Sequence, residues 1–236
     1  MNKQSNVYTT IYIILLVVIV GTALAVTSLS LHDRQQANID ADKQRQILAA
    51  VHVTADAATI SETYNKYITE SLVTNERGTI EEGVDAFGVN VSAEVKKPAA
   101  ERQLPVFIAT LDDRTVKYVL PVYGAGLWGP IWGYIALDSD GSTIYGAYFA
   151  HQGETPGLGA EIEKPHFCDE FNQKELFKDG RFFPVEVVKA GQHPVNADAD
   201  YVDGVTGGTI TSKGVGAMID NSLTPYQAYL KTLSEK

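Results

Sequence analysis

The chain is poor in cysteine, which limits the cofactors that it can hold. Cys168 is the only cysteine among 236 residues. A single thiol cannot form an intrachain disulfide, a thiolate zinc site or an iron–sulfur cluster. The sequence therefore excludes these sites, and we expect Cys168 to be a small buried residue.

Clusters of basic residues are also missing. The chain has 19 Lys and Arg against 29 Asp and Glu, a net charge of −10, and its basic residues are scattered. Proteins that bind a phosphate backbone need clustered cations to displace its counterions, so nucleic acid is excluded as a partner. A hydrophobic content of 44% fits one or two ordinary domains and is not the composition of a disordered chain.

Several site motifs are absent too. There is no G-x-G-x-x-G after a strand and no G-x-S-x-G elbow. His151 with Glu154 and Glu161 fits no zinc spacing, so we expect a hydrogen-bonded structural histidine and no metal. Asp138 and Asp140 resemble the start of a calcium loop, but the acidic residue at its end is missing, which favours a hairpin turn.

The longest uncharged stretch, residues 11–31, predicts a membrane anchor. As a helix its 21 residues span roughly 31 Å at about 1.5 Å per residue, close to the hydrocarbon thickness. Thr22–Ala25 resembles a cleavage site, so a removable secretion signal is the alternative. Lys3 is the only basic residue before the stretch, and apolar residues continue beyond the possible cleavage site to Leu31. Both features favour a retained anchor. No ionisable residue inside it marks an ion pathway.

The remaining pattern predicts an α+β fold. Apolar residues at helical spacing predict helices over 32–53 and from the capping-box pattern at Thr59 to a stop at 75–78. The period then changes to two and predicts two hairpins, one at 104–111 with 115–122 and one at 131–137 with 144–150. A short helix is predicted within 169–180, and a further strand at 182–188. Strands grouped between helices indicate a mainly antiparallel sheet flanked by helices, behind a single N-terminal transmembrane helix.

The stretch 203–212 presents a threonine hydroxyl beside adjacent glycines. Gly207–Gly208 has no Cβ atoms, so a bulky ligand can approach the backbone there and reach Thr209. Thr211 or Ser212 is the predicted N-cap of the C-terminal helix, and a helix start favours phosphate. On spacing alone, the same glycines favour a simple turn before a helix.

Two other segments have the composition of a binding pocket. Residues 124–133 interleave Leu127, Trp128 and Trp132 with glycines, although a glycine-rich strand entry with core tryptophans has the same composition. Residues 151–159 combine hydrogen-bonding side chains, a rigid proline turn and an apolar side chain. Such a loop can pack on one face of an aromatic ring system and bind its edge.

D-G-V-T-G-G-T-I-T at 203–211 is similar to the D-x-x-(S/T)-G-A-T-x-(S/T) motif of proteins that receive FMN from a flavin transferase. This resemblance implies that Thr209 carries FMN through a phosphoester. Gly208 stands where that family usually has alanine, and glycine is the sterically milder residue. Thr206 and Thr211 are the next candidates for attachment.

The anchor, G-L-W at 126–128, H-x-G-E-T-P-G-L-G at 151–159 and the FMN motif resemble, in this order, the C subunits of sodium-translocating NADH:quinone oxidoreductases. The G subunits of related ion-translocating ferredoxin:NAD oxidoreductases share the last two motifs and are the alternative. G-L-W and the long segment before it favour the first family. The resemblance implies a single-pass protein of the bacterial inner membrane, with its soluble domain on the periplasmic side.

The same resemblance implies a set of site residues and partners. The flavin ring would lie against Glu154, Thr155 and Leu158. The wider set of expected cofactor-binding residues adds Leu127, Trp128, Gly157, Gly207 and Gly208. From charge and position we add Lys213 beside the phosphate, with Asp203 and Thr206 for recognition by the transferase. The flavin would relay single electrons between other subunits of a membrane redox complex, with lipid and the transferase as further partners and no complete active site in this chain.

We expect the chain to divide into an N-terminal tail and anchor at 1–33, a helical or mixed segment at 34–100 and an FMN-binding domain at 101–236. Two other functions use the same residues. One is an exported module that binds a small ligand, with Thr209 unmodified. The other is a hydrolase with Thr209 or Ser212 as nucleophile beside His151 and Asp203, although its usual elbow motif is absent.

Overall fold

The computed structural model describes residues 6–234, and their contacts divide the chain between Lys43 and Gln44. The tail with Lys3 lies outside the described residues. Helix α1 (Asn6–Ala50) contains the described residues of the first unit, and its last residues belong to the second. The expected domain boundaries at residues 33 and 100 stay predictions.

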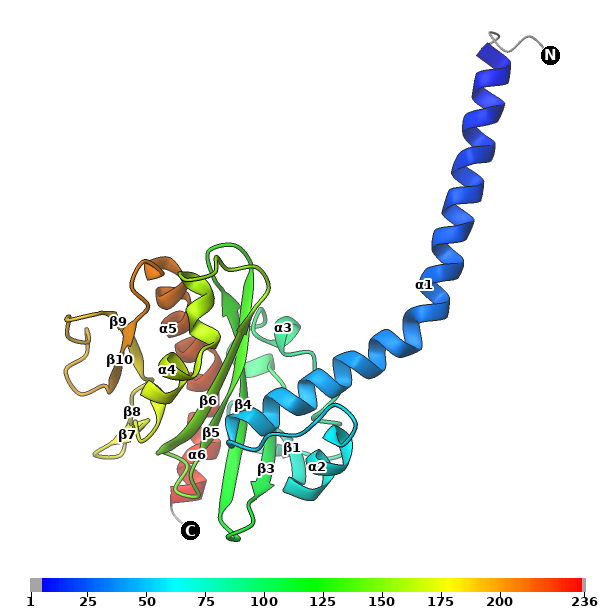
Figure 1. Ribbon diagram of the computed structural model, residues 1–236. Coiled ribbons are helices and arrows are strands. Elements are labelled where there is room, and N and C mark those ends of the chain that lie inside the picture. Colours follow the sequence, from blue (N-terminus) through cyan, green and yellow to red (C-terminus); the bar gives the residue numbers. More distant parts are fainter. Residues whose placement is uncertain (1–5, 235–236) are drawn as a thin grey trace. The chain divides into compact units, whose positions relative to one another are not determined.

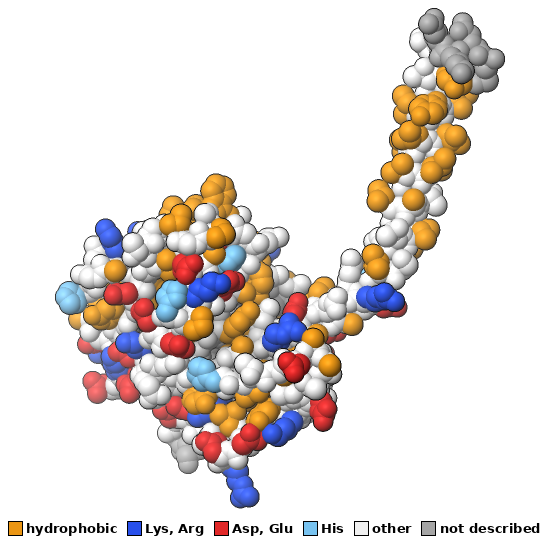
Figure 2. All heavy atoms as spheres, viewed as in Figure 1, with side chains coloured by type: hydrophobic (Ala, Val, Ile, Leu, Met, Phe, Trp, Pro, Cys, Tyr) orange, Lys and Arg blue, Asp and Glu red, His pale blue; other side chains and the backbone are white. Residues whose placement is uncertain are grey.

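Helix α1 is long and apolar enough to cross a membrane, and the apolar window of this helix is fully exposed. Hydrophobic side chains line it in Figure 2. The predicted helix over 32–53 is its continuation, which ends at Ala50. The Val53 amide bonds to the Leu48 carbonyl and the His52 amide to the Ala49 carbonyl, with His52 at a φ of 59°. This left-handed turn satisfies carbonyls that the helix end leaves open.

An antiparallel six-stranded sheet in the order β2-β1-β3-β4-β5-β6 forms the centre of the second unit (Figure 1). Both predicted hairpins are confirmed, since β3 pairs with β4 and β5 with β6. The strands are β1 (Ile68–Thr74), β2 (Ile80–Glu81), β3 (Leu104–Thr110), β4 (Val116–Ala125), β5 (Pro130–Leu137) and β6 (Ile144–His151).

The helix predicted from Thr59 to residue 75 is too long. Helix α2 (Ile60–Tyr67) stops after two turns, and β1 follows it directly. Thr59 precedes the helix without a side-chain capping bond, so the capping box is not formed. Strand β1 contains several β-branched residues and pairs with β3, and this tertiary pairing overrides the apolar spacing that indicated a helix.

The segment after β6 also differs from the prediction. Where a helix was expected within 169–180, only the short turn η3 (Asp169–Phe171) forms, and the expected strand 182–188 is interrupted at Pro184. Proline has no amide proton for a strand ladder. The short elements between the main strands and the C-terminal helices are α3 (Val91–Glu94), η1 (Ala99–Glu101), η2 (Gly159–Glu163), α4 (Pro165–Cys168), β7 (Phe177–Lys178), β8 (Arg181–Phe182), β9 (Glu186–Lys189) and the parallel β10 (Tyr201–Gly204).

One face of the sheet is covered by α5 (Thr209–Leu223), with η4 (Thr224–Tyr226) and α6 (Gln227–Ser234) after it (Figure 1). A Cβ at Gly124 would lie 2.7 Å from the Met218 Cβ, so α5 packs closely on β4. Cys168, the last residue of α4, belongs to the apolar core, as its expected packing role requires, and burial raises the pKa of its thiol to about 11. The N-terminus of α5 therefore lies at the end of the sheet where β4 leads into β5.

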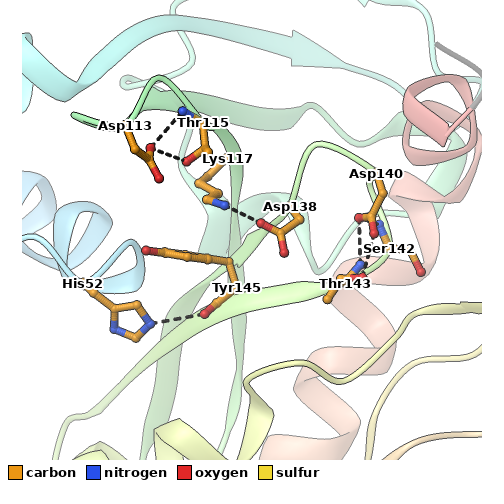
Figure 3. A network of polar contacts seen from close by, with 9 residues as sticks. All are labelled: His52, Asp113, Thr115, Lys117, Asp138, Asp140, Ser142, Thr143 and Tyr145. Carbon is orange, nitrogen blue, oxygen red and sulfur yellow. Dashed lines mark hydrogen bonds and ion pairs between the residues drawn. The ribbon is translucent and has the colours of Figure 1, made fainter.

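The opposite end of the sheet carries charged turns (Figure 3). Asp140 accepts hydrogen bonds from the amides of Ser142 and Thr143 at 2.8 and 2.9 Å. Asp138 forms an ion pair with Lys117. The stretch that resembles a calcium loop is thus the predicted turn between β5 and β6.

Candidate functional site

Thr209 is the first residue of α5 and is exposed. Gly208 is the N-cap, and the Ser212 amide already bonds to its carbonyl at 2.8 Å. The predicted N-cap at Thr211 or Ser212 is therefore wrong, because the helix begins earlier. The open amides of the helix start lie at Thr209 itself and the residues just after it.

The loop before α5 is fixed by a side chain of the helix. The Ser212 hydroxyl accepts a hydrogen bond from the Val205 amide at 2.9 Å. Gly207 has a φ of 79°, and a Cβ there would lie 2.6 Å from Leu158 Cδ2. Glycine is needed both for this conformation and for the approach of Leu158.

Gly208 is buried, and a Cβ there would lie 3.2 Å from the Leu158 carbonyl oxygen. An alanine would fit only after a shift of a few tenths of an ångström. The departure from the usual alanine therefore relieves a tight contact in this chain.

Glu154 joins three segments that lie far apart in the sequence. Its carboxylate accepts hydrogen bonds from the Trp128 amide at 2.8 Å and from the Thr211 hydroxyl at 2.5 Å. Glu154 is 4% exposed. Burial by itself raises the pKa of Glu154, but the hydrogen bonds from Thr211 and the backbone amides outweigh it and hold the pKa below its ordinary value. The group is a buried carboxylate that stays ionised near neutral pH.

Two glycines leave room for this carboxylate. A Cβ at Gly126 would lie 2.5 Å from one carboxylate oxygen of Glu154. A Cβ at Gly159 would lie 2.5 Å from the other oxygen and 2.5 Å from the Thr211 hydroxyl oxygen. Any larger residue at either position must push the carboxylate away from its donors.

His151 accepts a hydrogen bond from the backbone of Glu154. Its Nδ1 accepts the Glu154 amide proton at 3.1 Å, and its Nε2 lies 3.5 Å from Glu163 Oε2. Because Nδ1 is the acceptor, the neutral ring carries its proton on Nε2. Among residues 6–234, no group of three or more His, Cys, Asp or Glu could hold a metal ion.

A hollow of about 220 Å³ lies on one side of Thr209. Its apolar walls are partly exposed, Leu127 by 48% and Leu158 by 42%. Hydrophobic side chains gather at the β4–β5 loop in Figure 2. The lining residues are Leu127, Glu154, Thr155, Leu158, Gly159, Gly207, Gly208, Thr209, Ile210 and Thr211.

A second hollow of about 460 Å³ also reaches Thr209. Lys213, four residues later on the same face of α5, lines it together with Lys189 from β9 and with His193. Glu186, Val187 and Val188 of β9 are also among its lining residues. Thr209 thus borders an apolar hollow and a hollow with two lysines.

The other predicted site residues are placed less centrally. Trp128 takes part through its amide, while the residue is 68% exposed. Gly157 is exposed with a φ of 73° and lies outside both linings. Asp203 is exposed in β10, with its amide bonded to Glu170 Oε2 at 2.9 Å. Thr206 is exposed and lines the second hollow.

The His151 and Ser212 side chains, which a hydrolase would use as base and nucleophile, form hydrogen bonds with backbone amides instead. His151 bonds to the Glu154 amide, and the Ser212 hydroxyl bonds to the Val205 amide. These contacts give no support to a nucleophile and base working together. Thr211 is buried and hydrogen-bonded, so it is poorly suited as an alternative acceptor of FMN.

The contacts of Thr211, Gly126 and Gly159 with Glu154 were not predicted. No local pattern reveals them, because Thr211 and Glu154 are 57 residues apart. A buried carboxylate in a loop needs donors, and this requirement is the one signal that could have prompted a search for them.

The class of protein follows from the FMN-binding domain family, whose sequence profile matches residues 126–224, from the β4–β5 loop to just past α5. The C subunit of Na(+)-translocating NADH-quinone reductase from Vibrio alginolyticus is 32% identical over 86% of this chain and 83% of its own, and that of Vibrio anguillarum is 30% identical over 93% and 91%. The crystal structure of the same subunit from Parabacteroides distasonis is 49% identical, with a TM-score of 0.79 over 85% of this chain and 96% of its own. The chain belongs to the family of the C subunits of Na(+)-translocating NADH-quinone reductase, as the sequence motifs predicted.

The residues around Thr209 suit FMN. A flat ring system needs an apolar hollow with a few polar groups, which Leu127, Leu158 and Thr155 provide. A phosphate group needs amides and a cation, which the start of α5 and Lys213 provide. The arrangement therefore fits both parts of the cofactor.

Proposed function

We propose that the chain carries FMN covalently, through a phosphoester on the Thr209 hydroxyl. The observation that supports this most is the position of Thr209. It is an exposed hydroxyl on the first residue of a 15-residue helix, between two hollows of different chemistry. The helix start and Lys213 favour the negative charge of the ester there.

The ring of FMN is proposed to occupy the apolar hollow. Leu127 and Leu158 would cover its faces, and the positions of Glu154 and Thr155 in the lining suit contacts with its edge. Gly207 and Gly208 keep the approach to this hollow open. We propose smaller contributions from the exposed Trp128 and from Gly157, which shapes the loop through its positive φ.

Asp203 and Thr206 are proposed to serve recognition by a flavin transferase. Both are exposed and precede the helix, so an enzyme can reach them. A carboxylate close to the phosphoester would disfavour it, which argues against a role for Asp203 in holding the product. An unchanged labelling rate in Asp203→Asn would leave this residue with a turn role only.

The proposed role is a relay of single electrons within a Na⁺-translocating NADH:quinone reductase. When bound, FMN supplies the redox chemistry, since it can exchange single electrons. The chain contributes the pocket, the attachment point and the anchor, while other subunits supply donor and acceptor sites. We propose that α1 spans the bacterial inner membrane among lipid and partner subunits, with the second unit on the periplasmic side.

Thr209→Val tests the attachment. The substitution removes the acceptor oxygen but keeps the β-branched shape, so co-expression with a flavin transferase is expected to give a folded protein without covalent flavin. Intact mass and flavin fluorescence after denaturation measure this. Thr224→Val, an exposed threonine just past the other end of α5, is the matched control and is expected to label fully. Full labelling of Thr209→Val would contradict the proposal.

The relay role has a separate test. The flavinylated chain, purified in detergent, is expected to be reduced by dithionite but not directly by NADH, and to show no NADH:quinone reductase activity. Turnover by the chain alone would mean that donor and acceptor sites both lie within it. A wild-type chain that stays unlabelled but binds FMN reversibly would favour a small-ligand-binding module.

A further inference from the structure

We propose that Thr211 and Glu154 form a positioning pair, and that Thr211 belongs to the FMN motif because of this pair rather than because a transferase recognises it. The proposal rests on the proposed flavin site and adds a role for its last motif residue. Thr211 is 2% exposed and Glu154 is 4% exposed. A side chain with so little exposed surface is a poor recognition element for another enzyme.

The pair connects the three segments that enclose the apolar hollow. Thr211 belongs to α5, Glu154 to the loop after β6, and the Trp128 amide to the β4–β5 loop. The carboxylate accepts from both donors at once. Leu127 comes directly before Trp128, and Leu158 follows Glu154 in the loop after β6. Both leucines line the hollow. The bonds of Glu154 therefore set the separation of the two apolar walls.

A carboxylate accepts from both groups at once, since the two donors converge on two different oxygens of Glu154. A glutamine would keep one acceptor oxygen for the Trp128 amide and bring an amide group that donates. The Thr211 hydroxyl would then have to accept, and its own proton would lose its acceptor. The negative charge of Glu154 also lies in the lining of the hollow, where it disfavours added negative charge on a bound group.

The test uses the full chain in detergent with Thr211→Val, Glu154→Ala and Thr211→Ser. Hydrogen exchange of the peptide that contains the Trp128 amide is followed by mass spectrometry in a Thr209→Val background, where no flavin is attached. We expect exchange to become about tenfold faster in Thr211→Val and Glu154→Ala, as the loss of one buried hydrogen bond implies. Thr211→Ser keeps the hydroxyl and is expected to restore slow exchange.

The matched control is Thr224→Val, which removes a threonine hydroxyl bonded to Asp220 at 2.9 Å, away from the hollow. It is expected to leave exchange at Trp128 unchanged. Thr211→Ala takes the place of Thr211→Val should that variant fail to fold. Because these measurements need no flavin, they test the pair even where flavinylation of Thr209 fails.

The labelled protein supplies a second readout. With Thr209 restored, Glu154→Gln is expected to raise the midpoint potential of the flavin, because a buried negative charge is removed, whereas Thr211→Ser leaves it unchanged. Unchanged exchange at Trp128 in both Thr211→Val and Glu154→Ala would overturn the proposal. Slower labelling with unchanged exchange would also overturn it and assign Thr211 to transferase recognition.

Discussion

The turn carboxylates Asp113 and Asp140 at one end of the central sheet and the buried Glu154 at the other accept their hydrogen bonds from different distances along the chain. At the charged end, Asp113 and Asp140 accept hydrogen bonds from residues two or three positions further along their own turns (Figure 3). At the end that carries Thr209, Glu154 accepts from Trp128 and from a residue 57 positions away. The first arrangement closes a turn, whereas the second holds separate segments around a hollow.

The difference shows how one sheet can be stable at one end and open to a ligand at the other. Local hydrogen bonds form wherever the turn sequence allows them. A hollow has to be held open by bonds between its walls, since partly exposed apolar walls otherwise tend to close on each other. Changes at the two ends should therefore have different consequences for the flavin.

The largest effect is expected for Gly159→Ala. The new methyl group would lie 2.5 Å from both Glu154 Oε2 and Thr211 Oγ1, so it forces them apart and lowers the free energy of unfolding by about 2–3 kcal/mol. Urea unfolding measures this. Gly153→Ala, six residues earlier in the same loop, meets nothing within 4 Å and is expected to be neutral. Equal stabilities of the two variants would contradict the role given to the buried carboxylate.

A smaller loss is expected for Lys117→Met at the charged end. Lys117 is buried, pairs with Asp138 and lies 4.0 Å from the centre of the Tyr145 ring. Its removal leaves a half-buried carboxylate unpaired and should cost about 1–2 kcal/mol, while flavin labelling stays at the wild-type level. A labelling defect would show that the two ends are coupled.

Lys66→Met is the matched control for that prediction. It breaks a second Lys–Asp pair at the same end, with Asp112, in which both side chains are exposed. Solvent screens such a pair, so no measurable change in unfolding is expected. A loss as large as that of Lys117→Met would mean that burial does not decide the effect.

The smallest effect is expected for Asp140→Asn, and it should depend on pH. Burial raises the pKa of Asp140, but hydrogen bonds from Thr143 and the Ser142 amide outweigh it, so the pKa lies below its ordinary value. A carboxyl group with a lowered folded-state pKa stabilises above its unfolded pKa of about 4, and this is lost as the pH falls through the folded value. Because Asp140 is exposed and solvent screens its interactions, the variant is expected to lose no more than about 0.5 kcal/mol at neutral pH.

Unfolding curves of wild type and Asp140→Asn between pH 7 and pH 2 measure this dependence. The gap between the two should be constant at neutral pH and should close in acid. A gap that widens in acid would have the wrong sign for a lowered pKa.

Much of the fold was predictable because its signals are local. The uncharged stretch, the period-two segments and the turn residues at Asp140 predicted the apolar helix, both hairpins and the β5–β6 turn. The wrong predictions concern segments whose secondary structure depends on contacts with residues far away in the sequence. Residues 68–74 form a strand because β3 is available to pair with them, and the helix after Gly208 begins at Thr209 because the chain already turns there.

The sequence by itself determined the family and the residue types of the site, since the motifs around Gly126, Glu154 and Thr209 are short and contiguous in the sequence. The tertiary structure alone decided how these motifs cooperate. Hydrogen-bond partners of a buried carboxylate are chosen by position in space, and nothing in the local sequence states that Thr211 and the Trp128 amide reach the same Glu154. The hollow beside Thr209 is lined by residues of all three segments that this buried carboxylate joins.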